Sequence, residues 1–346
     1  MGKVPANRPP ARTTVAALGV SLLLALGACT SAPTVEQPSA EKSPVSAASV
    51  PAQDSSQLDA TAASVLESGP SPTIGSIGGD WSVFALARAK SVTGTAIPEE
   101  YFKEYIARVE SALADASEFP ALPKLNESKS TENSRVALTL MALGKNPSDA
   151  AGVDLLSPLA DLEYAGAQGV NGTAWALVAV DAAGQTQTSA KLLKDLLGQE
   201  IRGGGFALAG DEPDPDVTAM ALIALAPHKD DPAAAEVVER GIKALEAIQL
   251  DNGGFESWGT QALESVAMCV VALATLGVEP NERLTKGGGL LAAMERFRSG
   301  GAYRHTVDGD PDPIATDQAL LALVASERLA NGKVGLFDFS DVEDAR

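Results

Sequence analysis

Acidic, aromatic and polar residues recur where apolar helical stretches begin, and these positions are the ones that could do chemistry. The acidic ones are Asp80, Glu132, Asp216, Glu264 and Asp317. Near the same ends stand Trp81, Arg135, Asn171, Trp175 and Trp258. If the helices run side by side, these residues gather at one mouth, where carboxylates and aromatic rings would hold a sugar, a corrinoid or a cationic peptide. Each carboxylate also has a second interpretation as a helix cap.

Aspartates that alternate with proline precede two of these stretches, in Asp214-Pro215-Asp216 and in Asp310-Pro311-Asp312-Pro313. Such loops could offer oxygen ligands to Ca²⁺. They are also typical of turns in which an X-Pro pair ends one segment and starts a helix, and we favour that interpretation. Asp216 stands before Thr218 and an apolar run, which predicts that it is the N-cap of the helix.

The composition excludes several kinds of site and partner. Two cysteines, Cys29 and Cys269, and two histidines, His228 and His305, argue against a disulfide and against a Cys/His zinc centre. The formal net charge is −19, and loss of residues 1–28 would remove three basic and no acidic residues, giving −22. Because so acidic a surface repels phosphate backbones, we expect no nucleic-acid partner.

Six apolar stretches, spaced 39 to 52 residues apart, organise the chain. They are 84–87, 136–139, 175–178, 220–223, 268–271 and 318–321. Each is apolar nearly all round, which indicates a helix that is buried on most faces. Six amphipathic segments lie before or between them, at roughly 57–68, 98–115, 147–163, 187–199, 232–249 and 280–298.

This alternation predicts an all-α fold in which apolar helices form an inner ring and amphipathic helices an outer ring. Six pairs is the number at which an (α/α)₆ toroid closes, and an open two-layer solenoid is the alternative. We expect one domain over residues 56–332. The acidic tail 333–346 should pack on it through Leu336, Phe337 and Phe339.

Glycine-rich turns join outer to inner helices at Gly204-Gly205-Phe206, Gly253-Gly254-Phe255 and Gly300-Gly301-Ala302-Tyr303. The second follows Gln249 and reads Q-L-D-N-G-G-F. The glycines permit a tight turn, and we expect a positive φ at Gly254. This pattern resembles the repeat of the squalene–hopene cyclase and protein prenyltransferase superfamily over residues 57 to about 332, most strongly from 199 to 325. The resemblance implies an α/α toroid.

The same resemblance offers specific activities. The segment from Asp214 to Ala219 is similar to the D-x-D-D-T-A segment of class II terpene cyclases, which implies Asp216 as a general acid and Asp214 as its companion. Val217 stands where the family has its third aspartate. The chain is also only 4% aromatic, whereas a cyclase steadies carbocations with aromatic rings. Protein prenyltransferases need a zinc site, but Ala267 stands where their aspartate would precede Cys269.

The N-terminus is typical of an exported bacterial lipoprotein. Lys3, Arg8 and Arg12 precede the apolar residues 15–28, a stretch that is too short to span a membrane. Leu26-Gly27-Ala28-Cys29 resembles a lipobox. We expect a signal peptide at 1–28, lipid on Cys29, a flexible Ser/Pro/Ala-rich tether at 29–55, and attachment to the outer face of the cell membrane.

These observations predict a lipid-anchored, extracytoplasmic toroid that binds a small-molecule, glycan or protein ligand at an acidic mouth. The tentative binding residues are Asp80, Trp81, Arg135, Asn171, Trp175, Asp216, Trp258, Glu264 and Asp317. The alternative is an extracellular enzyme, either terpene cyclase-like with Asp216 as the acid or carbohydrate-active. No metal is assigned, and cobalamin and Ca²⁺ stay open as ligands.

Overall fold

The structure is a computed structural model that describes residues 55–75, 77–115 and 117–343. Cys29 and the segments expected to be signal peptide and tether lie outside the described residues, apart from Ser55. Within residues 51–346 the chain forms one compact unit. Six helices correspond to the apolar stretches: α2 (Ile77–Ala89), α4 (Ser130–Ala142), α6 (Val170–Ala182), α8 (Pro215–Leu225), α10 (Leu263–Thr275) and α13 (Pro313–Ala330).

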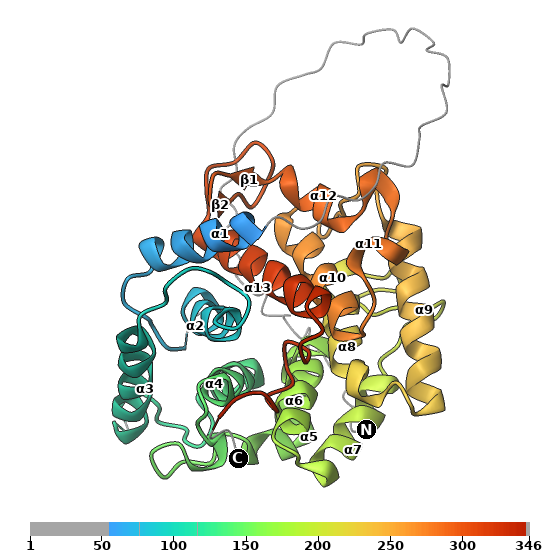
Figure 1. Ribbon diagram of the computed structural model, residues 1–346. Coiled ribbons are helices and arrows are strands. Elements are labelled where there is room, and N and C mark those ends of the chain that lie inside the picture. The colour runs from blue at the N-terminus through green and yellow to red at the C-terminus, as the bar shows by residue number, and fades with distance from the viewer. Residues whose placement is uncertain (1–54, 76, 116, 344–346) are drawn as a thin grey trace, which may run out of the picture. The chain divides into compact units, whose positions relative to one another are not determined.

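These six inner helices form a closed ring. Each packs against the next in chain order, and α13 packs back against α2, as Figure 1 shows. Burial on most faces explains their composition, since nine of the 11 residues of α8 are buried, from Pro215 to Leu225. The expected all-α toroid is confirmed, and its closure excludes the open solenoid.

The outer layer contains four continuous helices: α1 (Ser55–Ser68), α3 (Glu99–Ala114), α7 (Thr186–Leu197) and α9 (Pro232–Ile248). The helix α9 begins after Asp231, whose side chain accepts hydrogen bonds from the backbone N–H groups of Ala233 and Ala234. Its buried stripe includes Val237 and Ile242, which face the ring. One apolar stripe therefore attaches each such helix to the inner layer.

The expectation of continuous outer helices over 147–163 and 280–298 is wrong. The first segment divides into short turns, η1 (Pro147–Asp149), η2 (Ser157–Ala160), α5 (Leu162–Ala165) and η3 (Gly166–Gln168). The second divides into α11 (Pro280–Arg283), η5 (Lys286–Gly288), α12 (Leu290–Glu295) and the two-stranded hairpin of β1 (Arg298–Ser299) and β2 (Ala302–Tyr303). Ala151 and Gly152 adopt positive φ in the first segment, and Gly287, Gly288 and Gly289 do so in the second. Such residues end a helix whatever its apolar pattern.

The glycine-rich turns place a fully buried aromatic ring, Phe206, Phe255 or Tyr303, beneath an inner helix. Thr218 and Thr316 hold two of these turns, because each hydroxyl accepts the backbone N–H of the aromatic residue at 2.9 Å. The expected positive φ at Gly254 is wrong. The left-handed residue of that turn is Gly253, with φ 85°.

Candidate functional site

At the start of α8, Asp214 and Asp216 have roles that differ from those predicted from the sequence. Asp214 is the N-cap: one carboxylate oxygen accepts the backbone N–H groups of Asp216 at 2.9 Å and Val217 at 3.0 Å. The other oxygen accepts the hydroxyl of Ser257 at 2.7 Å. The expectation that Asp216 is the cap is therefore wrong. Pro215 occupies the first position of the helix, so the cap is the residue before it, Asp214.

Asp216 lies in the first turn with its Oδ1 atom buried and without a hydrogen-bond partner. Burial raises the pKa of Asp216 to about 6; the charges of Asp214 and Glu264 add to this shift, and Ser265 and Ser257 oppose it. The Ser265 hydroxyl is itself buried and forms no hydrogen bond of normal geometry. Two buried polar atoms, Asp216 Oδ1 and Ser265 Oγ, thus lack a hydrogen bond of normal geometry at one point of the ring, which is costly for a fold and common where a site performs a function.

Asp80 and Arg135, two residues expected at the mouth, form a buried ion pair between α2 and α4. Asp80 Oδ2 lies 2.7 Å from Arg135 Nε, and Asp80 Oδ1 accepts the hydroxyl of Tyr105 at 2.8 Å. Burial raises the pKa of Asp80, and Arg135 opposes the rise. Arg135 also pairs with Glu132. The pair and its two partners, Tyr105 and Glu132, lie on α2, α3 and α4, so the structure places the pair inside the wall of the toroid.

Trp81 and Trp175, two further residues of the expected mouth, meet in the centre of the ring with ring centroids 4.9 Å apart. Phe84 packs against Trp81, and Phe337 from the C-terminal tail stacks on Phe84 with centroids 5.4 Å apart. Phe337 also touches Trp175, and Phe339 touches Phe84. These five rings form a central aromatic cluster to which the tail contributes two.

The remaining expected residues lie near the start of the inner helices in different surroundings. Glu264 pairs with His305, its Oε2 lying 2.9 Å from the imidazole Nδ1. Asp317 is buried and accepts the Ser82 hydroxyl at 2.7 Å, and burial raises the pKa of Asp317 to about 7. Asn171 is half-buried in the first turn of α6. Trp258 is 78% exposed.

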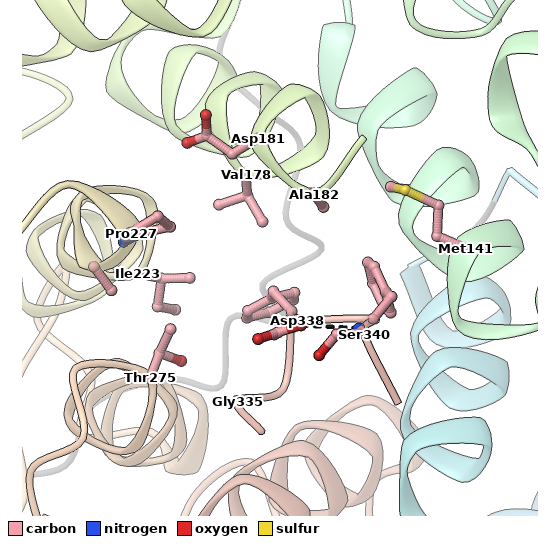
Figure 2. Close-up of a pocket in the computed structure, with 13 residues that line it drawn as sticks. Met141, Val178, Asp181, Ala182, Ile223, Pro227, Thr275, Gly335, Asp338 and Ser340 are labelled. Carbon is pink, nitrogen blue, oxygen red and sulfur yellow. Dashed lines mark hydrogen bonds between the residues drawn. The ribbon is translucent and has the colours of Figure 1, made fainter. Parts of the chain in front are cut away.

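A cavity of about 450 Å³ lies at the opposite, C-terminal ends of the inner helices. Its wall comes from the last turns of α4, α6, α8 and α10, closed on one side by the tail, as Figure 2 shows. The apolar wall residues include Met141, Val178, Ile223 and Phe337. A volume of this size falls in the range of small-ligand sites, roughly 300–1,000 Å³. Sequence reasoning missed this cavity because its residues come from four helices that show no polar motif at these ends.

Two buried arginines hold the tail at the edge of this cavity. Arg88 of α2 and Arg328 of α13 contact the two oxygens of Asp341 at 2.9 Å and 2.5 Å. Arg88 also donates to the backbone oxygen of Asp338 at 2.8 Å. Against the effect of burial, hydrogen bonds from Arg328 and Arg88 lower the pKa of Asp341. The expected packing of Leu336, Phe337 and Phe339 is confirmed, whereas nothing in the sequence pattern pointed to these arginines.

One ion pair borders the cavity itself. Asp181, which lines it, contacts His228 with 2.7 Å between Oδ2 and Nε2. The hydrogen bond to Asp181 raises the pKa of His228. In the described part of the chain, no three or more His, Cys, Asp or Glu side chains are grouped to hold a metal ion, and no helix is long and apolar enough to cross a membrane.

Comparison with known proteins gives a likeness in structure and none in sequence. No protein-family model matches the chain, and no curated protein is significantly similar to it in sequence. Among solved structures it is similar to the ent-copalyl diphosphate synthase from Streptomyces platensis, with 19% identity and a TM-score of 0.49. The match covers 72% of this chain and 50% of that protein, so the chain spans about half of that protein's length. The assignment of the toroid rests on the closure of the helix ring described above.

Proposed function

We propose that this protein is a binding protein whose ligand occupies the cavity between the C-terminal ends of the inner helices and the tail. The observation that carries the proposal is the cavity itself, about 450 Å³, whose wall combines apolar side chains with polar groups. A ligand there would bury apolar surface against Met141, Val178 and Ile223, at a gain of about 25 cal/mol per Å². The polar groups of its wall, such as Asp181, Thr275 and Asp338, would orient the ligand.

A cavity-filling variant tests this proposal. Ala182 lines the cavity from the last turn of α6, and its neighbour Ala183 does not. We expect native mass spectrometry of protein purified from its own host to show the extra mass of a bound small molecule. Ala182→Trp should remove that mass, and Ala183→Trp should retain it. Loss of the mass in both variants or in neither would contradict the proposed site.

We further propose that the protein is held on the outer face of the cell membrane by lipid on Cys29. The support is the basic, apolar and lipobox-like order of residues 1–29. Replacing Cys29 with Ala should release the protein into the soluble or extracellular fraction, because the acyl chains are the expected anchor. Retention of Cys29→Ala on membranes after a high-salt wash would contradict the lipid anchor.

A second candidate function is general acid catalysis by Asp216. It is favoured by the buried, unpartnered Oδ1 atom and by a pKa raised to about 6, which keeps the carboxyl group protonated over a wider range of pH. Such an acid could protonate an alkene or epoxide. Its test is conversion of linear isoprenoid alkenes and epoxides, followed by gas chromatography: catalysis requires products with the parent and none with Asp216→Asn. If the parent gives no products, catalysis by Asp216 is contradicted and only the binding function remains proposed.

A further inference from the structure

The segments that lead into three neighbouring inner helices carry most of the large exposed apolar side chains of the described chain. We define the rim loops as residues 207–214, 250–262 and 304–314. They precede α8 and α10 and, in the third case, include the first two residues of α13, Pro313 and Ile314. The large hydrophobic residues that are exposed are Leu162, Leu208, Trp258 and Ile314. Three of these four belong to the rim loops. Because single exposed apolar residues are common but gathered ones are not, their concentration at this end needs a reason.

Trp258 shows the feature most clearly. Its side chain is 78% exposed, whereas Trp81 and Trp175 are each 8% exposed. Its backbone has φ 52°, a left-handed conformation that is uncommon for a bulky residue and costs free energy. The turn that carries it is closed by the hydrogen bonds between Ser257 and Thr260, both at 3.0 Å. A strained turn thus holds a large apolar ring out in solvent.

The rim loops are tied into one surface. Ser257 donates its hydroxyl to the Asp214 carboxylate at 2.7 Å, which joins the second loop to the first. The backbone N–H of Leu263 donates to the oxygen of His305 at 3.0 Å, which joins the third loop to the first residue of α10, directly after the second loop. The contact of His305 with Glu264 adds a side-chain link from the third loop to α10. The three exposed apolar residues are therefore presented on a fixed base.

The charge of the rim loops is strongly one-sided. Their exposed acidic residues are Asp211, Glu212, Asp251, Glu256, Asp308 and Asp310. The basic residues in these loops are Arg304 and His305. Arg304 donates to the backbone oxygen of Arg298 and to Ser299, and His305 faces Glu264, so both are engaged within the protein. Asp216 and Ser265, with their unsatisfied buried oxygens, lie where the first two rim loops enter their helices.

We propose that the rim loops form a docking surface for a basic protein segment in which Lys or Arg side chains flank large apolar ones. The apolar side chains would cover Leu208, Trp258 and Ile314, and the cations would meet the surrounding carboxylates. Charge complementarity of this kind accelerates association and selects the partner. The cation also has a favourable position over the exposed indole face. The surface lies at the opposite end of the inner helices from the proposed ligand cavity, so the two functions are independent.

The test uses a short synthetic peptide in which Lys alternates with Leu and Ile, and its counterpart with Glu for every Lys. Binding is followed by calorimetry and by iodide quenching of tryptophan fluorescence. Because Trp258 is the exposed tryptophan among the three in the sequence, quenching reports on this surface. We expect the Lys peptide to protect Trp258, with an affinity that falls as salt rises, and the Glu peptide to give no protection.

Matched variants locate the surface. The double variant Leu208→Ser with Ile314→Ser should weaken the Lys peptide at least tenfold, whereas Leu162→Ser, at similar exposure outside the rim loops, should leave it unchanged. Equal binding of both peptides, unaltered binding by the double variant, or no protection of Trp258 by the Lys peptide would each overturn the proposal. Protection by soluble oligosaccharides that is lost in Trp258→Ser and insensitive to salt would overturn it in favour of a stacked sugar.

Discussion

At the scale of single residues, the start of α8 separates two aspartates by their surroundings. Asp214 is stabilised by three hydrogen bonds, whereas the Oδ1 atom of Asp216 receives none. Burial of this oxygen without a hydrogen bond favours the protonated form of the Asp216 carboxyl group, so the folded state loses stability as the group ionises with rising pH. The two residues should therefore respond in opposite ways to the same substitution.

We predict that Asp216→Asn stabilises the protein above about pH 6. The folded-state pKa of Asp216 is raised from 3.8 to about 6, so the parent loses stability as the pH rises through that window and recovers none above it. The free energies of unfolding of Asp216→Asn and the parent should then differ by at most about 3 kcal/mol. Denaturant unfolding of both proteins from pH 4 to pH 8 measures it. Asp317, whose pKa is raised to about 7, adds the same pH dependence to the parent and to Asp216→Asn. The difference between the free energies of unfolding of the two proteins is therefore the quantity to follow.

The matched change at the cap should behave differently. Asp214→Ala removes the acceptor of two backbone N–H groups and should cost about 1 kcal/mol, while Asp214→Asn keeps an oxygen and should cost less. If Asp216→Asn gives no gain above pH 6, or if Asp214→Ala proves neutral, the assignment of cap and buried acid is wrong.

At the scale of secondary structure elements, the glycine-rich turn before α10 depends on one glycine more than on the other. Gly253 has φ 85°, and a Cβ there would lie 2.8 Å from the backbone oxygen of Lys286. A Cβ on Gly254 would meet the Asn252 side chain at 3.2 Å, a contact that a small shift relieves. We predict that Gly253→Val costs more than about 2 kcal/mol and Gly254→Ala less than about 1 kcal/mol, measured by urea unfolding. Similar costs for both would contradict the turn geometry.

The tail is the second element whose stability can be predicted. Asp341→Ala would leave the buried guanidinium groups of Arg88 and Arg328 without their carboxylate, which should cost about 3 kcal/mol and make the tail sensitive to protease. Asp338→Ala is the control, since Asp338 is exposed and its side chain accepts one backbone N–H from Ser340. Equal protease resistance of the parent and Asp341→Ala would show that the tail is held by its apolar residues alone.

The inner helices could be predicted from the sequence because burial on most faces leaves a continuous apolar pattern, as in α8. The breaks in the outer layer could not be predicted. An amphipathic stripe persists over 147–163 and 280–298, although positive φ at Ala151 and Gly152 and at the glycines from Gly287 breaks the helices. The cavity and the contacts of Arg88 and Arg328 with Asp341 could not be predicted either, because they join distant parts of the chain. Arg88 and Asp341, for example, are more than 200 positions apart. No local pattern carries that information.

At the scale of the whole molecule, closure of the inner ring couples all of its helices. Far-UV circular dichroism reports on the helices, and the fluorescence of Trp81 and Trp175 reports on the centre of the ring. We predict that both signals change in one transition on heating, because no inner helix can leave without exposing two neighbours. The iodide-accessible signal of Trp258 should be subtracted by measuring Trp258→Ser alongside. An earlier change of the central tryptophans would show that the ring opens before its helices melt.

Ring closure also sets the order of events during synthesis. Because α13 supplies the neighbour of both α10 and α2 and packs on α1, the first helices of the toroid lack their final partner until residues 313–330 have emerged. The tail that completes the cavity is made later still. A nascent chain stopped before residue 313 therefore presents two unpaired apolar helix faces to chaperones and proteases, and the ring can close only after α13 has been made.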